Sequence, residues 1–344
     1  MGSIPEEVIV PHFVGGGRIE KTSKSVQAPG QGQLVIKVEA NALCGSERSQ
    51  FFNGSPDITP GHEAAGIVVS SGPRTSTSVG TRGAVFLMDF CGMCRSCLKG
   101  FTNQCLNKRA DMGFSHDGGY GVYELIHENI FFPVDSSLSG TDTTLLLDIM
   151  GTGGHSIRRA QRAHSDITSL IVAGAGPIGL GVLAMAKIML GFDLPVYIYD
   201  VVDYRLALAE DLGGIAISLA GGKTLSNGLK HHGVSQIDVA IDTSGKKAAR
   251  ESSLHSLAQR GVLVLVGHGE ELLLNVSPNM IATERTVLGS EYFAYSELAV
   301  NYKYLAQNHD YIAKIITHRF GVEDIQHAFD LFFSGKCGKV IIEQ

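Results

Sequence analysis

The segment AGAGPIGLG is the feature that most limits the folds open to this chain. It spaces its glycines as G-x-G-x-x-G, follows the apolar run SLIVA and opens the apolar run PIGLGVLAMAKIML, which predicts a strand, a tight turn and a helix. Asp200 ends the next predicted strand, VYIYD, twenty-one positions beyond Gly179. This context indicates a dinucleotide-binding unit rather than a membrane span or an ordinary buried helix.

Each glycine of this unit has its own physical task. The first permits the tight turn, the second lets the backbone approach a pyrophosphate, and the third lets helix and strand pack closely. Free N–H groups at the start of the helix favour phosphates, and an acidic residue after the second strand binds ribose hydroxyls but would repel a 2′-phosphate. NAD is therefore favoured over NADP. The predicted cofactor-binding residues are Gly174, Gly176, Pro177, Ile178, Gly179, Asp200 and Arg205, of which the last could also be a helix surface residue.

Strands alternate with helices from about Ser169 onward, which predicts a parallel sheet covered on both faces. The first third of the chain instead carries short β runs between Gly, Pro and Ser turns, such as LVIKVEANAL and AAGIVVSS. A length of 344 residues favours two domains over one. Beyond the strands, the predicted helices run through Lys187 and over Arg205–Leu212, Lys246–Gln259 and Glu297–Gln307.

Charge and terminal sequence restrict the partners and the location. The chain has 28 basic and 34 acidic residues, a net charge of −6 and no basic stripe, so a nucleic-acid partner is not expected. The start, MGSIPEEVIV, lacks a basic region followed by an apolar core, so it is not predicted to be a secretory signal. No membrane partner is expected either, and a cytoplasmic location, where thiols stay reduced, is the default.

Four of the six cysteines lie in the segment DFCGMCRSCLKGFTNQC, with the spacing C-x2-C-x2-C-x7-C. A disulfide knot, an iron–sulfur cluster and a zinc site are the three candidate explanations, and a reducing compartment disfavours the first. Four thiolates suit either metal site, but hydride chemistry elsewhere in the chain favours zinc over a one-electron cluster. A closed four-thiolate zinc site has a structural role. Its predicted ligands are Cys91, Cys94, Cys97 and Cys105.

A second possible metal site is spread along the chain. Cys44 follows an apolar strand in ALCGSERSQ, His62 and Glu63 stand in TPGHEAAG, and Asp148 stands in LLLDIMGTGGHS. One thiolate, one imidazole and one carboxylate are a mixed set typical of a catalytic zinc with an open position. Taken singly, each residue has an ordinary structural explanation, so the hypothesis depends on their joint placement beside a dinucleotide-binding unit.

Together these motifs resemble the zinc-dependent medium-chain alcohol dehydrogenases, a family that includes sorbitol, threonine and other polyol dehydrogenases. The segments CGSE, PGHEAAG, CGMCRSCLKGFTNQC, DGGYGVYE, AGAGPIGL and GKVII occur in the family's order. The resemblance implies an α/β protein with a GroES-like, mostly β catalytic domain at residues 1–145. It also implies a Rossmann domain with a doubly wound parallel sheet at 146–290, and a return to the catalytic domain at 291–344.

The resemblance also implies roles for the metal-site residues. Cys44, His62 and Asp148 match the ligands of the catalytic zinc, and Glu63 matches a glutamate that can ligate the metal or exchange with water. The four clustered cysteines match the structural zinc lobe. Glu47 departs from the aspartate that usually supports the zinc-bound histidine.

Two further matches concern the proton and the cofactor. Ser46 matches the hydroxyl that hands the substrate proton to the cofactor ribose, but Ser49 stands where many relatives continue that relay with a histidine. Thr152 and His155 match positions near the nicotinamide. The departure at Ser49 interrupts the family's usual relay, and ordered water is the alternative route for the proton.

The function implied is hydride transfer between NAD and a secondary alcohol, polyol or cyclitol-like substrate, giving the ketone, with zinc as the Lewis acid. The alternative is a redox-neutral isomerase or lyase on the same fold that uses tightly bound NAD transiently. A retired enzyme with a binding role is disfavoured because it would need neither the metal ligands nor Asp200. Pairing of relatives near Val287–Phe293 implies a homodimer or homotetramer.

Overall fold

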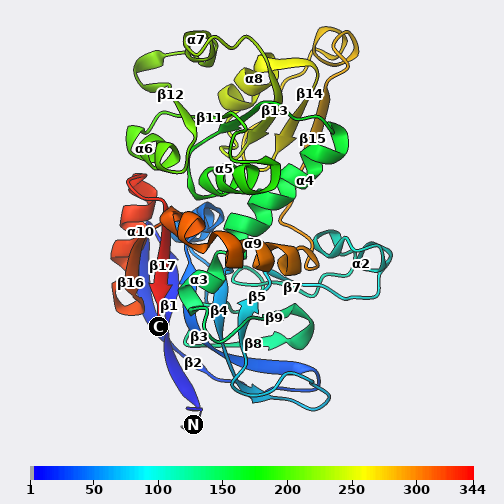
Figure 1. Cartoon of the computed structure of the whole chain (residues 1–344). Helices are drawn as coiled ribbons and strands as arrows, with labels where there is room; N and C mark the ends of the chain where they lie inside the picture. The colour runs from blue at the N-terminus through cyan, green and yellow to red at the C-terminus, as the bar shows by residue number, and fades with distance from the viewer. Residues whose placement is uncertain (1–3) are drawn as a thin grey trace.

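A six-stranded, fully parallel sheet forms the upper half of the molecule (Figure 1) in the computed structural model, which describes residues 4–344. Met1–Ser3 lie outside the described residues. They are the start of the segment in which no secretory signal is predicted. The strands stand in the order β12-β11-β10-β13-β14-β15, which confirms the predicted parallel sheet. They are β10 (Leu170–Ala173), β11 (Val196–Asp200), β12 (Ile215–Ser218), β13 (Ile237–Asp242), β14 (Leu257–Leu265) and β15 (Thr286–Gly289).

Both faces of this sheet are covered. Successive residues of its buried strands therefore point to opposite faces and pack in different apolar clusters. Val172 packs in one apolar cluster with Leu183, whereas its neighbour Ile171 packs in another with Leu225 and Leu254. This alternation explains why the strands read as continuous apolar runs. The helices of this half are α4 (Gly153–Ala163), α5 (Pro177–Leu190), α6 (Asp203–Asp211), α7 (Leu225–His231) and α8 (Lys247–Ser256).

A second sheet of seven strands lies in the lower half and joins the last strands of the chain to strands from its first 133 residues (Figure 1). Its order is β16-β17-β3-β4-β5-β9, with β8 also paired to β3. The C-terminal strand β17 thus lies antiparallel to β3, which pairs on its other side with β4. Its strands are β3 (Gln33–Ala42), β4 (Ala64–Ser71), β5 (Arg82–Val85), β8 (Tyr123–His127), β9 (Phe131–Pro133), β16 (Ile316–Gly321) and β17 (Lys339–Glu343).

The remaining elements surround these sheets. A hairpin of β1 and β2, which the sequence patterns do not predict, packs beside the C-terminal helix α10, and β6 and β7 flank the four-cysteine segment. None of the helices within residues 4–344 is long and apolar enough to cross a membrane. The elements are β1 (Glu7–Gly15), β2 (Arg18–Ser25), β6 (Met88–Asp89), β7 (Ala110–Asp111), α1 (Arg48–Asn53), α2 (Arg95–Leu98), α3 (Gly140–Thr144), α9 (Glu297–Ile312) and α10 (Ile325–Ser334).

Several predicted boundaries are wrong. The helix predicted over Lys246–Gln259 ends at Ser256, because Leu257 is fully buried and pairs with Ile237 as the first residue of β14. Of the region Val287–Phe293, near which subunit pairing is expected, only the residues up to Gly289 belong to the edge strand β15. The chain then turns sharply into α9, with Tyr292 in a left-handed conformation.

Candidate active site

The possible metal ligands come together through the pairing of β3 with β4. Cys44 follows the end of β3, while His62 and Glu63 immediately precede β4, and Asn41 of β3 pairs with Ala64 of β4. The end of one strand therefore meets the start of the other. Asp148 arrives from a single π-helical turn, Asp148–Thr152, that leads into α4.

These four side chains form one buried cluster. The ligand atoms of Cys44, His62, Glu63 and Asp148 all lie within 4.8 Å of one another, and all four residues are buried. The Cys44 Sγ lies 3.3 Å from Asp148 Oδ2, and His62 Nε2 lies 3.5 Å from the same oxygen. Ligands about 2.0–2.3 Å from a tetrahedral zinc are separated by about 3.3–3.8 Å, so the three residues fit such an ion.

The electrostatics of the cluster also suit a cation. Burial raises the pKa of the Cys44 thiol, and the charge of Asp148 raises it further. Burial raises the pKa of Glu63 to about 8, although the charge of Lys339 opposes this. Burial alone would lower the pKa of His62, but hydrogen bonds to Asp148, Cys44 and Glu47 hold it well above its ordinary value. One thiol and two carboxyls crowded around a histidine would be stabilised by a bound dication.

Glu47 orients the histidine of the cluster. Its Oε1 lies 3.2 Å from His62 Nδ1, while its Oε2 accepts a 2.8 Å hydrogen bond from the hydroxyl of Tyr120 and a 3.3 Å bond from the N–H of Cys44. The carboxylate is fully buried. Donation from His62 Nδ1 to Glu47 leaves Nε2 free to ligate a metal. Tyr120, which fixes Glu47, was not predicted as a site residue.

A buried ion pair lies behind the cluster. Glu63 Oε1 pairs with Lys339 Nζ, and both side chains are almost wholly buried. Lys339 is the first residue of β17, so the pairing of the C-terminal strand with β3 brings it to this place. Sequence reasoning missed Lys339. The available signal was a lysine directly preceding the apolar strand VII.

One large cavity, of about 1490 Å³, joins the metal cluster to the dinucleotide loop. Its lining contains all of the predicted cofactor-binding residues, whereas His62 and Glu63 lie behind it and His155 faces a different cavity. The predicted residues that share this lining are Cys44, Ser46, Asp148, Thr152, Gly174, Gly176, Pro177, Ile178, Gly179, Asp200 and Arg205.

The geometry of the glycine loop fits a bound pyrophosphate. Gly174 has a φ of 91°, and a Cβ on Gly179 would stand only 1.9 Å from the Gly174 carbonyl oxygen. A Cβ on Gly176, in contrast, would meet nothing closer than an Arg205 nitrogen at 3.8 Å, so this glycine leaves open space in the cavity. Asp200 Oδ2 accepts a 2.7 Å hydrogen bond from the N–H of Ala175 and so braces the loop.

Hydroxyl groups contact the cluster and line the same cavity as the glycine loop. Ser46 Oγ is 3.5 Å from His62 Nε2, and Thr152 Oγ1 donates a 2.7 Å hydrogen bond to Asp148 Oδ1. Ser49 also lines the cavity. His155 instead pairs with Glu297 through its Nδ1 at 2.7 Å.

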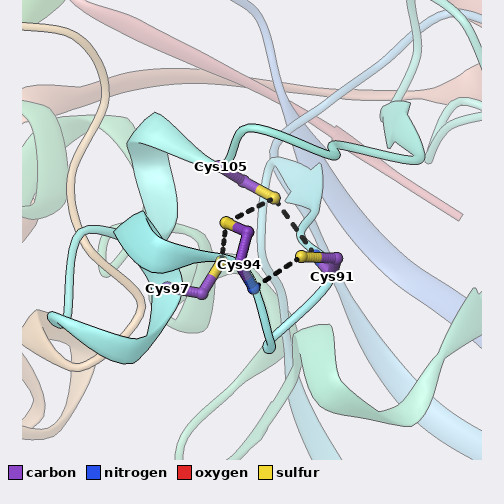
Figure 2. A group of neighbouring side chains, drawn as sticks. All are labelled: Cys91, Cys94, Cys97 and Cys105. Atoms are coloured by element: carbon purple, nitrogen blue, oxygen red, sulfur yellow. Dashed lines mark hydrogen bonds between the residues drawn. The ribbon is translucent and has the colours of Figure 1, made fainter.

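The four-cysteine lobe, Cys91–Cys105, forms a separate site (Figure 2). Cys94 Sγ lies 3.5 Å from Cys97 Sγ and 3.9 Å from Cys105 Sγ, close to the roughly 3.8 Å expected around a tetrahedral zinc. All six cysteines of the chain are free, so the disulfide explanation is wrong. Hydrogen bonds from the N–H groups of Cys97 and Leu106 lower the pKa of Cys94 to about 6, which favours the thiolate that a metal requires.

Two family descriptions match separate parts of the chain. Residues 30–136 match the alcohol dehydrogenase GroES-like domain, and residues 177–306 match a zinc-binding dehydrogenase. These matches confirm the predicted fold class. The zinc-binding description also favours zinc over an iron–sulfur cluster in the four-cysteine lobe.

Similar proteins extend along nearly the whole chain. An Escherichia coli (strain K12) protein described as an uncharacterized zinc-type alcohol dehydrogenase-like protein, YphC, is 29% identical over 97% of this chain and 98% of its own length. L-threonine 3-dehydrogenase from Coxiella burnetii is also 29% identical, over 91% of this chain and 92% of its own length. The solved structure of short chain alcohol dehydrogenase (rspB) from Escherichia coli CFT073, complexed with NADH, has a TM-score of 0.88 at 21% identity and covers 99% of this chain and 100% of its own; it demonstrates a shared fold.

Proposed function

Because this chain belongs to the family of zinc-dependent medium-chain alcohol dehydrogenases, we propose that it oxidises a secondary alcohol, polyol or cyclitol-like substrate to the ketone with NAD as hydride acceptor. The chain is an oxidoreductase of alcohols or polyols. The observation that supports the specific reaction best is the shared cavity, in which Cys44 and Asp148 line the same space as the glycine loop. A metal held there would reach the oxygen, and a nicotinamide bound there would reach the hydrogen, of the same substrate carbinol group.

In this proposal Cys44, His62 and Asp148 hold the catalytic zinc, and the thiols of the four-cysteine lobe hold the structural zinc. When bound, zinc polarises the alcohol oxygen as a Lewis acid and NAD accepts the hydride. Glu47 keeps His62 in the orientation and tautomer that leave Nε2 toward the metal site. Glu63, held by Lys339, is the fourth side chain of the cluster with a ligand atom within range.

The proton of the substrate hydroxyl leaves through Ser46, which lines the cavity beside His62. Ser49 lines the same cavity, and its hydroxyl accepts a 3.2 Å hydrogen bond from Asn53, so it can extend a relay through its own O–H. Two serines with intervening water take the place of a serine–histidine pair. This route requires no titration near neutral pH.

The choice of NAD over NADP depends on Asp200. Its carboxylate ends β11, lines the cavity and accepts hydrogen bonds from main-chain N–H groups, which fix it in place. A 2′-phosphate near this charge would be repelled. Arg205, five residues later, lies over the open space at Gly176 and supplies a cation toward the phosphates or ribose.

The organisation of the chain supports three further proposals. The catalytic domain comprises residues 1–145 and 291–344, since β16 and β17 complete its sheet, and the cofactor domain comprises 146–290. The edge strand β15 offers a surface for a homodimer or homotetramer. The six free cysteines suit a cytoplasmic location.

A panel of secondary alcohols and polyols, tested with NAD by the absorbance of NADH, checks the proposed reaction. We expect turnover of at least one secondary alcohol or polyol, and weaker turnover with NADP. Absence of NADH formation with every substrate, in protein that contains zinc, would instead favour a redox-neutral reaction with transient use of NAD.

A further inference from the structure

The segment Ser290–Tyr295, between β15 and α9, contributes a tyrosine to the main cavity. Tyr292 lines this cavity together with Cys44, Ser46 and Asp148. The sequence patterns connect this region, near Val287–Phe293, only with subunit pairing. Their side chains therefore have no assigned task in the reaction.

The backbone at Tyr292 is held in an unusual conformation. Its φ of 42° lies in the left-handed region, which bulky side chains seldom adopt unless the surroundings enforce it. The next residue, Phe293, is fully buried and packs edge-on against Phe86 at a centroid distance of 5.1 Å. It also abuts Gly151, where a Cβ would stand 2.2 Å from the Phe293 ring. Phe293 thus packs against the π-helical turn that carries Asp148. Tyr292, the strained residue before it, lines the cavity.

The four-cysteine lobe holds this segment at two points. The 3-10 helix Thr102–Gln104 lies within the lobe, before Cys105. Asn103 Nδ2 donates a 2.8 Å hydrogen bond to the carbonyl oxygen of Glu291, and Thr102 Oγ1 accepts a 2.8 Å bond from the N–H of Tyr295. Both bonds join a lobe side chain to the main chain, so they fix the backbone on either side of Tyr292.

The hydroxyl of Tyr292 is free to bind a ligand. Burial raises the pKa of the Tyr292 hydroxyl above its ordinary value, so the group is protonated and can donate a hydrogen bond. No hydrogen bond joins this hydroxyl to any of the residues 4–344 that the structure describes. Tyr292 is half-buried and lines the cavity, so a bound substrate can supply the partner that the protein does not.

We propose that Tyr292 contacts the substrate, binding a second hydroxyl group beside the one that is oxidised, and that Asn103 and Thr102 of the four-cysteine lobe are positioning residues for it. This inference rests on the proposed function and narrows its substrate class to vicinal diols and polyols. It also gives the four-cysteine lobe a part in substrate recognition. A simple secondary alcohol lacks the group that Tyr292 binds.

The direct test compares butane-2,3-diol with butan-2-ol in Tyr292→Phe, which removes only the hydroxyl. We expect kcat/KM for the diol to fall about 5- to 10-fold, mainly through KM, because one hydrogen bond to substrate is lost, and kcat/KM for butan-2-ol to change less than about 2-fold. Calorimetric Kd values of the diol for the enzyme–NADH complex should weaken by a similar factor. Equal losses with both alcohols, or an unchanged Kd and kcat/KM for the diol, would overturn the proposal.

The positioning role is tested with Thr102→Val, which keeps the shape but removes the acceptor, and Thr102→Ser, which keeps it. We expect Thr102→Val to lower the diol to butan-2-ol ratio of kcat/KM several-fold and Thr102→Ser to preserve it, with unchanged zinc content in both. A preserved ratio in Thr102→Val would refute the role of the lobe. If wild-type enzyme turns over no secondary alcohol or polyol of the panel, the proposed function fails, whereas the calorimetric comparison still decides whether Tyr292 binds the diol.

Discussion

Replacement of Glu47 tests how the protein prepares His62 for metal binding. Three buried groups depend on this carboxylate: His62 Nδ1 at 3.2 Å, the Tyr120 hydroxyl at 2.8 Å and the Cys44 N–H at 3.3 Å. In Glu47→Ala all three lose their acceptor, and each buried donor left unpaired costs about 1–3 kcal/mol. Two of the three belong to residues of the metal cluster, so the loss concerns metal binding as well as folding.

The expected size of the effect follows from these contacts. Loss of the partner of a metal-bound histidine typically costs about 10- to 100-fold in metal affinity. We expect Glu47→Ala near the upper end of this range and Glu47→Gln near the lower end, because glutamine retains one acceptor oxygen. Zinc affinity is measured by competition with a chromophoric chelator, and kcat/KM in the same preparations with zinc in excess.

Tyr120→Phe is the matched control for Glu47. It removes one hydrogen bond to the carboxylate but leaves Glu47 beside His62, so zinc affinity should change less than about threefold while stability falls by about 1 kcal/mol. Wild-type zinc affinity in Glu47→Ala would refute the reasoning. An equally large loss in Tyr120→Phe would show that packing, and not the orientation of His62, is responsible.

Three other variants probe the fold and the cofactor site. Glu124 is buried with neither carboxylate oxygen partnered within residues 4–344, and burial together with the charge of Asp117 raises its pKa well above 4.5. The native state therefore holds a proton that the unfolded chain releases, so stability should fall by up to about 1.4 kcal/mol per pH unit as the pH rises above 4.5, until the raised pKa is passed. Glu124→Met should make this slope shallower in denaturant titrations by removing the contribution of Glu124, and an unchanged slope would contradict the assignment. Lys339→Met leaves Glu63 buried without its cation and should destabilise by about 3–5 kcal/mol in the same titrations, with Glu63→Gln in the double variant recovering most of the loss. Asp200→Ser should raise the NADP to NAD ratio of kcat/KM by about 10-fold or more and also raise KM for NAD, whereas a constant ratio would mean that Asp200 does not select the cofactor.

Local sequence patterns are sufficient to predict the half of the fold that contains the parallel sheet. The glycine loop, the apolar strands and Asp200 lie within one continuous stretch, where spacing and hydrophobicity act over short distances. Predicted helix and strand boundaries are wrong where contact with a distant residue determines the local structure. Leu257 is an example, because its pairing with Ile237 ends the helix early. The hairpin β1–β2 escapes prediction for a related reason, because β2 is mostly exposed and carries little apolar alternation.

The residues of the candidate site also fall into those that local sequence predicts and those that only the fold brings together. The ligand types Cys44, His62 and Asp148 can be recognised from the sequence because their chemistry is unusual in combination. Lys339 and Tyr120 reach the cluster only through the pairing of β17 with β3 and the packing of a distant loop, which no local pattern encodes. The left-handed backbone at Tyr292 likewise depends on the burial of its neighbour.

The central claim is that one zinc ion is shared by Cys44, His62 and Asp148 in the cavity that binds NAD. Anomalous diffraction at the zinc absorption edge, from crystals of the full chain grown with NAD, tests it most directly. We expect one anomalous peak among the four lobe cysteines and a second bounded by Cys44 Sγ, His62 Nε2 and an Asp148 oxygen, beside density for the nicotinamide. A catalytically active crystal form with zinc in the lobe alone would contradict the account.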